Sequence, residues 1–356
     1  MALEQAEILI VGGGIAGLST AYHLARAGQK GVLLLDREDL PGFYASGHNA
    51  GVGRQLTGRA EHTALAIEGA RRLHEEGLVS GCGGLLLGAE RGGTDVLAAE
   101  AEHFQLPVVR GAGPVLPGLQ AVEHLAIPSD GVIDIDRLLG HCADGARAHG
   151  ASLRFGWEVG AIRPAADGFE VETDHGSIWT RLLVNAAGAW CGEIGRRAGG
   201  LQLSFQAPRR HLVWSNAPYP VDQPWAWWAD RPFYIRPESG GLLLCACEEQ
   251  EIALPQRHAQ PECDEAILES LSGSLRELVP SLADLPIARL WCGMRTFAPD
   301  RRFVLGPDPL NSNLFWVAGL GGHGMTSGLA VGDLAARAIL GRASTGPVDP
   351  VRFRNL

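Results

Sequence analysis

The sequence predicts an α/β fold (α+β in its two-domain arrangement): a Rossmann-like dinucleotide-binding domain with an antiparallel-sheet domain inserted into it. Three observations carry this prediction. The stretch "ILIVGGGIAG" near the N-terminus leads from an apolar strand through a glycine turn into a helix. The stretch "NLFWVAGLGGHGMTSGLAVGDLAARAIL" near the C-terminus repeats that pattern. Between them, segments rich in Trp, Tyr and Pro are typical of short strands.

The chain length and these textures together suggest where the two domains lie. At 356 residues the chain exceeds the usual size of one domain. We expect the dinucleotide-binding domain to comprise residues 1–81, 127–202 and 290–356. We expect a substrate-binding domain from residues 82–126 and 203–289.

The elements of the first domain follow from apolar runs and helix-ending glycines. A buried parallel strand is predicted at Glu7–Val11, a helix at Ile15–Ala27 that ends at Gly28, and a second strand at Gly31–Asp36. Further along, the patterns predict a helix at Ile135–Ala148, a strand at Leu153–Val159, a hairpin turn at Asp174–Gly176 and a helix near Glu265–Leu278. Residues 82–126 show no clear helical period.

Composition limits the classes of ligand. The formal net charge of −10 disfavours nucleic acid and anionic membranes, which both attract clustered Lys and Arg. No apolar run approaches the ~20 residues of a membrane span, and MALEQAE does not resemble a secretory signal. We therefore expect a cytoplasmic protein, a monomer or small homo-oligomer, whose ligands are small molecules. The seven scattered cysteines predict buried thiols and no metal site.

The first glycine turn has the spacing of a dinucleotide-binding loop. Gly12, Gly14 and Gly17 form G-x-G-x-x-G, which lets backbone N–H groups and a helix N-terminus meet a pyrophosphate. Asp36 follows Gly17 by 19 residues, at the end of the next strand, where a carboxylate can hold ribose hydroxyls. This loop alone does not separate a nicotinamide cofactor from a flavin.

Two later segments favour the flavin. "VNAAGAW" and "VAGLGGHGMTSG" each lead from a strand into small residues that let backbone approach a ligand. An extended FAD needs such contacts along its whole length. The second segment also opens a helix, whose N-terminus can stabilise an anionic reduced ring.

At this point the sequence resembles the D-amino-acid oxidase-type flavoproteins, a superfamily that includes glycine oxidase, sarcosine oxidase and D-amino-acid dehydrogenases. Within it, the chain looks most like bacterial D-arginine dehydrogenase. The segments that carry the resemblance, in order, are Gly12 to Gly17, Asp36, "ASGHNAGVGR", "VNAAGAWC", "PRRH", "FYIRPESGGLLL", "WCGMRTFAPDRRFVLGPD" and "LFWVAGLGGHGMTSG". They span nearly the whole chain, although residues 82–126 match poorly.

The resemblance implies a bound FAD. It is expected to be non-covalent, because the position of the flavin-linked cysteine in sarcosine-oxidase relatives falls on Gly293, one residue after Cys292. The cofactor-binding residues implied are Gly12, Gly14, Ile15, Ala16, Gly17, Asp36, Arg37, Ser46, His48, Asn49, Ala50, Val159, Ala187, Gly188, Trp190, Gly321, Gly322, His323, Gly324, Met325 and Thr326.

The resemblance also implies a substrate site. Arg295 in "GMRTF" aligns with the arginine that holds the substrate carboxylate, and a guanidinium fork suits a planar carboxylate. Arg210 and Tyr234 align with residues that bracket the same group. The neighbouring cluster Trp225, Trp227 and Trp228 is expected to be packing rather than a lid.

Other positions set the side-chain preference and leave alternatives open. Thr326 stands where relatives have Gln or Lys, and Gly84 offers no acid for a basic substrate, so D-Arg and D-Lys are not expected to be preferred. Arg54 either points into the pocket, favouring an acidic or polar side chain, or grips the FAD pyrophosphate, favouring a small or apolar one. His48 and His323 are candidates for a flavin hydrogen bond or a catalytic base.

The implied activity is FAD-dependent oxidation of a D-amino acid or small N-substituted amino acid. Hydride passes from Cα to flavin N5, and the imino acid hydrolyses to a 2-oxo acid and ammonia. The electron acceptor is oxygen or a quinone-type carrier. The alternatives are a 2-hydroxyacid dehydrogenase of the L-2-hydroxyglutarate type, which "SGHNAGV" also resembles, and a nicotinamide-dependent or non-catalytic nucleotide-binding protein.

Overall fold

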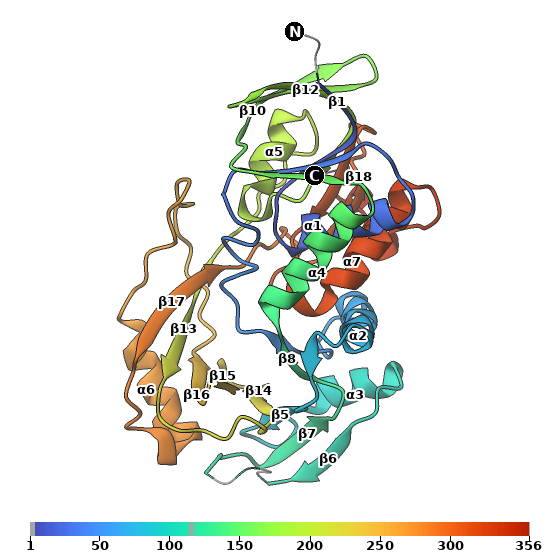
Figure 1. Ribbon diagram of the computed structural model, residues 1–356. Helices are drawn as coiled ribbons and strands as arrows, with labels where there is room; N and C mark the ends of the chain where they lie inside the picture. The colour runs from blue at the N-terminus through green and yellow to red at the C-terminus, as the bar shows by residue number, and fades with distance from the viewer. Residues whose placement is uncertain (1–3, 114–115, 117, 356) are drawn as a thin grey trace.

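The computed structural model describes residues 4–113, 116 and 118–355. Residues 1–3, 114, 115, 117 and 356 fall within the predicted ranges 1–81, 82–126 and 290–356 and lie outside the described residues. Two large sheets sit at opposite ends of the molecule, with both chain ends on the side of the first sheet (Figure 1). This arrangement confirms the predicted two-domain α/β class.

The first sheet combines a parallel centre with an antiparallel hairpin. Its strand order is β10 (Val159–Ala165), β11 (Gly168–Thr173), β12 (Gly176–Asn185), β1 (Glu4–Val11), β2 (Val32–Asp36) and β9 (Ser152–Phe155), with β19 (Leu314–Ala318) beside β12 and β18 (Val304–Pro307) beside β19. β1 pairs in parallel with both β2 and β12, and β12 with β19. The two ends of the chain therefore meet in one sheet, as the repeated strand–glycine–helix pattern predicts.

Helices cover both faces of this sheet. Ile8 and Ile10 of β1 face a core formed with α1 (Ile15–Arg26), α4 (Ile135–Ala148) and α7 (Gly324–Ile339). The alternating residues Leu9 and Val11 face a second core with α5 (Cys191–Arg197). A strand buried on both faces accounts for the unbroken apolar run of the first segment.

The first glycine turn admits only glycine at two positions. Gly12 has φ +118°, and a Cβ there would lie 2.3 Å from the carbonyl oxygen of Ala186, at the end of β12. A Cβ on Gly17 would lie 1.9 Å from the carbonyl oxygen of Gly12. The glycines therefore let the chain turn tightly between β1 and α1.

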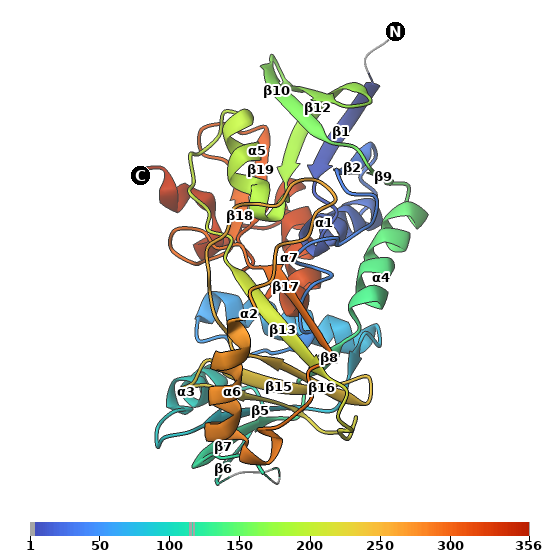
Figure 2. The same cartoon turned by 90° about the vertical axis from the view of Figure 1, so that its left-hand side faces the viewer.

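The second sheet belongs to the inserted segments. Its order is β17 (Arg289–Met294), β13 (Arg209–Ser215), β16 (Gly241–Cys245), β15 (Phe233–Glu238), β14 (Trp225–Trp228), β5 (Gly84–Gly88), β7 (Glu123–Ile127) and β6 (Val109–Ala112). Helix α6 (Ile267–Leu278) packs Leu271, Leu275 and Leu278 against it (Figure 2). β13 and β17 rise from this sheet toward the first one (Figures 1 and 2).

Two expectations about these inserted segments need correction. The sheet is not wholly antiparallel, because β14 pairs in parallel with β5; the two strands arrive from separate insertions and no hairpin joins them. β17 pairs with β13, so the second sheet also includes Arg289–Met294. The segment 82–126 contains a helix, α3 (Asp95–His103), whose only buried residue is Ala101, which explains the weak periodicity.

The remaining elements agree with the sequence apart from one strand. α4 begins and ends as predicted, with the Asp134 side chain accepting a hydrogen bond from the Arg137 N–H at its start. The hairpin turn between β11 and β12 is also confirmed. The single strand predicted at Leu153–Val159 is wrong: Gly156, with φ +77°, separates β9 from β10.

The smaller elements complete the two domains. Helix α2 (Ala60–Glu75) packs on α7, and a Cβ on its Gly69 would lie 2.1 Å from the carbonyl oxygen of Thr326. A three-stranded sheet joins β3 (Val52–Gly53), β8 (Gly131–Ile133) and β4 (Val79–Ser80). Short 3₁₀ turns lie at Gly188–Trp190, Pro280–Leu282, Gly346–Val348 and Pro350–Phe353. Over the described part of the chain, no helix is long and apolar enough to cross a membrane.

Candidate functional site

Two adjoining cavities run along the ends of the central strands of the first sheet. The first cavity reaches toward the second sheet and the second cavity toward Asp36. Both are lined by Gly14, Ala45, Ser46, Ala186, Gly188, Met294 and Thr296, so they form one elongated space. An elongated space of this kind suits an extended dinucleotide with a substrate beside one end.

The predicted site residues divide between these cavities. The first is lined by Gly14, Ile15, Ala16, Ser46, His48, Asn49, Ala50, Arg54, Gly188, Arg210, Tyr234, Arg295, Gly321, Gly322, His323, Gly324, Met325 and Thr326. The second is lined by Gly12, Gly14, Asp36, Arg37, Ser46, Val159, Ala187, Gly188 and Trp190. Gly17 lines neither cavity, and its close contact with Gly12 gives it a packing role in the turn.

In the second cavity, Asp36 is tied to the glycine loop. Its Oδ2 accepts the N–H of Gly13, and its Oδ1 accepts the N–H of Glu38 at 2.8 Å. Burial raises the pKa of Asp36, and these two hydrogen bonds oppose that rise. Arg37 lies over the Trp190 ring, 4.0 Å from its centroid. The cavity thus offers a fixed carboxylate and a flat aromatic wall.

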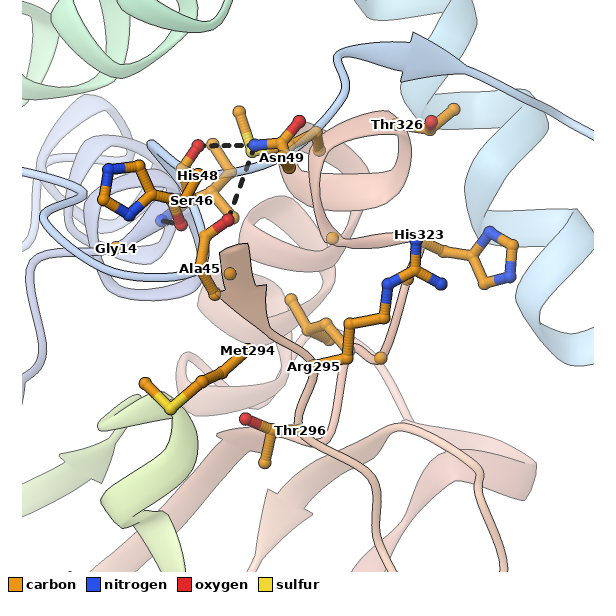
Figure 3. Close-up of a pocket in the computed structure, with 18 of the residues that line it drawn as sticks. Gly14, Ala45, Ser46, His48, Asn49, Met294, Arg295, Thr296, His323 and Thr326 are labelled. Atoms are coloured by element: carbon orange, nitrogen blue, oxygen red, sulfur yellow. Dashed lines mark hydrogen bonds between the residues drawn. The ribbon is translucent and has the colours of Figure 1, made fainter. Parts of the chain in front are cut away.

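The segment from Ser46 to Gly51 folds across the start of α1. Ser46 Oγ accepts the N–H of Ile15 at 3.0 Å. The Asn49 side chain donates to the Ser46 carbonyl at 2.5 Å (Figure 3). It also accepts the N–H of Gly51 at 2.7 Å. These bonds fix the loop between the two glycine-rich segments, where both cavities meet.

The start of α7 presents free N–H groups to the first cavity. α7 begins at Gly324 with His323 before it, and no side chain caps this end. The first turn of a helix carries unpaired N–H groups and a partial positive charge. Thr326 Oγ1 donates to the Val52 carbonyl at 3.3 Å, which engages this hydroxyl with the main chain.

Arg295 follows β17 directly and enters the first cavity. In Figure 3 its guanidinium lies toward His323, while Met294 points the opposite way. A Cβ on Gly322 would lie 2.6 Å from Nη1, so this glycine makes room for the guanidinium. Within the described ranges, no carboxylate lies within 4.0 Å of it. Burial, and secondarily repulsion from Arg210, lowers the pKa of Arg295.

Arg210 and Tyr234 are brought to the same cavity, as predicted. Arg210 Nε donates to the Glu248 carbonyl at 3.0 Å, and its Nη2 contacts Glu249 at 3.2 Å, so its position is fixed by neighbours. Tyr234 is 1% exposed, and burial raises its pKa well above 10, which keeps the phenol protonated as a donor.

The structure separates the three tryptophans of β14. Trp225 and Trp228 are fully buried, as expected for packing, whereas Trp227 lines the first cavity and stacks on Tyr234 with 4.5 Å between ring centroids. The Arg54 guanidinium lies 4.1 Å from the Trp227 centroid. Alternation along the strand places Trp227 on the face opposite to Trp228 but on the same face as Trp225, so the sequence pattern alone does not distinguish Trp227 from Trp225.

Arg54 is a second, half-buried cation in this cavity. Its Nη2 lies 3.4 Å from Nε2 of His323, and its Nε is buried with no hydrogen-bond partner in the part of the chain that is described. Burial, and secondarily repulsion from Arg295, lowers the pKa of Arg54 to about 10. Asp130, which attracts it at longer range, accepts hydrogen bonds from Gln55 at Oδ1, while its Oδ2 is buried without a partner among the described residues.

Both candidate histidines are neutral in this environment. Burial lowers the pKa of His323 well below 6.5, with repulsion from Arg54 adding to it. Since arginine only donates, His323 Nε2 is the acceptor in their contact. Burial also lowers the pKa of His48, opposed by a hydrogen bond with Gln260.

The residues present fit an FAD held without a covalent bond. A glycine turn with its acid, a joined pair of cavities and an uncapped helix start match what an extended dinucleotide needs. Cys292 Sγ contacts the Pro261 carbonyl at 3.3 Å and does not line either cavity. Gly293 does line the first cavity, and a Cβ there would lie 2.3 Å from the His48 carbonyl oxygen, so the position excludes a side chain.

Comparisons with known proteins agree with this architecture. The mitochondrial dimethylglycine dehydrogenase of Mus musculus is 29% identical over 377 residues, covering 95% of this chain and 42% of that protein, so the chain spans less than half the length of this curated relative. The crystal structure of iminodiacetate oxidase from Chelativorans sp. BNC1 has a TM-score of 0.79 at 25% identity, covering 96% of this chain and 97% of that one. L-Proline dehydrogenase from P. horikoshii shares the fold, with a TM-score of 0.87 at 23% identity and 99% of both chains covered.

The model of one protein family spans nearly the whole chain. The family described as FAD dependent oxidoreductase (DAO) matches residues 7–338, which include both glycine-rich segments and Arg295. This match confirms the superfamily suggested by the sequence motifs and the FAD cofactor. The chain belongs to the DAO family of FAD-dependent oxidoreductases.

Proposed function

We propose that the protein oxidises the Cα–N bond of a D-amino acid or small N-substituted amino acid. The observation that carries this proposal is the position of Arg295: a half-buried guanidinium fork, in a cavity next to the α7 start, with no acid partner among the described residues. A fork of this kind binds a carboxylate through two charge-assisted hydrogen bonds. The substrate would therefore be anchored by its carboxylate.

The other side chains of the first cavity orient the anchored substrate. Tyr234, as a neutral phenol, donates to the same carboxylate, and Arg210 adds positive charge from a fixed position. The stacked rings of Tyr234 and Trp227 form one wall and limit water around the reacting carbon. Proximity and exclusion of water are the contributions that this chain makes to the reaction.

The cofactor is assigned to the two cavities from their linings. Asp36 would hold ribose hydroxyls, the Gly12–Gly14 turn and α1 start the pyrophosphate, and the α7 start the pyrimidine edge of the ring. When bound, FAD supplies the acceptor for the two electrons and hydrogen that leave Cα. Contacts without a covalent link are expected, since Cys292 faces away from both cavities.

Among the residues that the structure describes, none is an evident general base for amine oxidation, and the proposal does not need one. His48 and His323 both have lowered pKa values and remain neutral, and His323 already contacts Arg54. We assign them to hydrogen bonding around the cofactor. The substrate amine enters neutral, and Cα loses hydrogen with its electron pair. Water then converts the imino acid to a 2-oxo acid and ammonia, or to a 2-oxo acid and an amine when the nitrogen is substituted.

The names of two similar proteins support the proposed substrate class. Proteins named dimethylglycine dehydrogenase and iminodiacetate oxidase are named for amines that also carry a carboxylate. The alternative activity within the same superfamily, oxidation of 2-hydroxyacids, would use the same carboxylate anchor but release no ammonia. Product chemistry therefore separates the two.

Anaerobic titration of the purified holoprotein tests the proposal. D-amino acids, N-methyl amino acids and 2-hydroxyacids are added in turn while the flavin absorbance is recorded, and ammonia or amine is measured afterwards. The expected result is bleaching by an amino acid with release of one ammonia or amine per reduced flavin. Bleaching by hydroxyacids alone, or a colourless protein that binds a nicotinamide cofactor, would overturn it.

A further inference from the structure

The first cavity holds more positive charge than one substrate carboxylate needs. Arg210 is balanced by Glu249, but Arg295 and Arg54 have no carboxylate within 4.0 Å in the described ranges. Unpaired buried charges are costly, and sites that contain them are usually completed by a ligand of opposite charge. One carboxylate on Arg295 leaves Arg54 without a carboxylate in contact among the described residues, and Asp130 attracts it only from longer range.

Arg54 is held as a binding group rather than as a mobile side chain. It lies 4.1 Å from the Trp227 ring centroid, within the range of a cation–π contact, and 3.4 Å from His323. Both contacts leave donors of the guanidinium free, and its Nε is buried without a partner among the described residues. The side chain is therefore oriented before any ligand arrives, which lowers the entropic cost of binding.

The position of Arg54 decides between the two roles that the sequence left open. It lines the first cavity together with Arg295, Tyr234 and Trp227, and it does not line the second cavity beside Gly12 and Asp36. A pyrophosphate bound at the first glycine turn would lie at the junction of the cavities, beside Ser46 rather than Trp227. Arg54 therefore belongs with the substrate.

We infer that Arg54 forms a second anion-binding subsite and that the preferred substrate is an amino acid with a second carboxylate. This inference rests on the proposed function, because Arg295 must hold the first carboxylate. The second carboxylate is carried either on the Cα side chain, as in aspartate and glutamate, or on the nitrogen substituent, as in iminodiacetate. The stacked Trp227 and Tyr234 rings would pack along the carbon chain between the two charges.

Pairs of substrates that differ by one carboxylate test the inference on the anaerobic holoenzyme. D-glutamate is compared with D-glutamine, D-aspartate with D-asparagine, and iminodiacetate with sarcosine, by the second-order rate constant of flavin reduction. At least one acid should exceed its neutral partner by about tenfold or more, as expected for a charge-assisted contact. The pair that shows the difference identifies whether the second carboxylate sits on carbon or nitrogen.

Two variants of Arg54 and one control complete the design. Arg54→Met keeps the length of the side chain and removes its charge, so the preference for the acid should disappear. Arg54→Lys should restore part of it. Arg59→Met removes an exposed cation five residues further along and should leave the preference intact. Equal rates for acid and neutral partners in the unaltered protein would overturn the inference while leaving the proposed function standing.

A binding measurement distinguishes failure of the anion-binding subsite at Arg54 from failure of the proposed amino-acid oxidation. Glutarate and butyrate, which cannot be oxidised at a Cα–N bond, are titrated by calorimetry into the holoprotein and into Arg54→Met. Tighter binding of glutarate that is lost in the variant supports the subsite even if no amino acid reduces the flavin. Equal affinities of glutarate and butyrate would contradict it.

Discussion

Replacement of Arg295 by Met separates its role in substrate binding from any role in folding. Because no carboxylate pairs with Arg295 among the described residues, removal of its guanidinium leaves no carboxylate without a partner there. It also removes the repulsion that Arg295 exerts on Arg54. We therefore expect Arg295→Met to keep its FAD and to melt at the same temperature as the unaltered protein or higher.

The cost to catalysis follows from the bonds lost. Two charge-assisted hydrogen bonds are worth about 1.5–3 kcal/mol each in a site that excludes water. Their sum, about 3–6 kcal/mol, corresponds to a loss of roughly 10²- to 10⁴-fold in kcat/KM. Since the carboxylate anchors the substrate before reaction, much of this loss should appear as weaker binding in the reductive half-reaction.

Stopped-flow reduction under anaerobic conditions provides the assay, with FAD content and thermal melting measured on the same samples. Arg289→Met is the matched control, because Arg289 lies on the same strand β17 but is exposed and stacks on Trp291. A change of less than about fivefold in Arg295→Met would refute the carboxylate anchor. So would an equal loss in the Arg289 variant.

Three further predictions concern the cofactor and stability. Gly12→Ala should lose FAD and at least about 2 kcal/mol of unfolding free energy, read from flavin content and denaturant melts, because its φ is +118° and a Cβ would lie 2.3 Å from Ala186 O. Acid precipitation should release all flavin into the supernatant, equally in Cys292→Ser; flavin retained with the protein pellet would contradict this. Burial lowers the pKa of His62 from 6.5 to about 4, so between these pH values the unfolded chain binds a proton at His62 that the folded chain does not. The free energy of unfolding should therefore fall, by about 3 kcal/mol at most, as pH drops from 6.5 to 4. His62→Gln should flatten that fall, and an unchanged pH profile of unfolding would count against it.

The parts of the fold that were predictable from sequence are those with strong local signals. The βαβ unit, α4 and the hairpin of β11 and β12 carry periodicity, caps or turns that act within a few residues. The parallel pairing of β5 with β14 could not be predicted, because it joins two separate insertions and no short-range pattern encodes it. Helix α3 was hidden for a different reason: it buries little, so its sequence carries no apolar stripe.

In the candidate site, too, some features could be predicted from the sequence and others could not. Glycine turns and the carboxylate Asp36 occupy fixed places relative to strands, so their positions in the cavities follow from spacing. The direction of a side chain such as Arg54 depends on what packs around it, here Trp227 and His323 from distant segments. Sequence therefore identified the residue but left its role open, and the contacts with Trp227 and His323 are the basis of the role that we infer for it.

Product analysis of a single anaerobic turnover tests the central claim most directly. The holoprotein is mixed with an N-methyl amino acid that bleaches the flavin, and the products are counted against reduced flavin. Anchoring by Arg295 and oxidation at Cα predict one 2-oxo acid and one methylamine per flavin, with no formaldehyde. Formaldehyde in equal amount to reduced flavin would place the reaction at the N-methyl carbon and contradict the account.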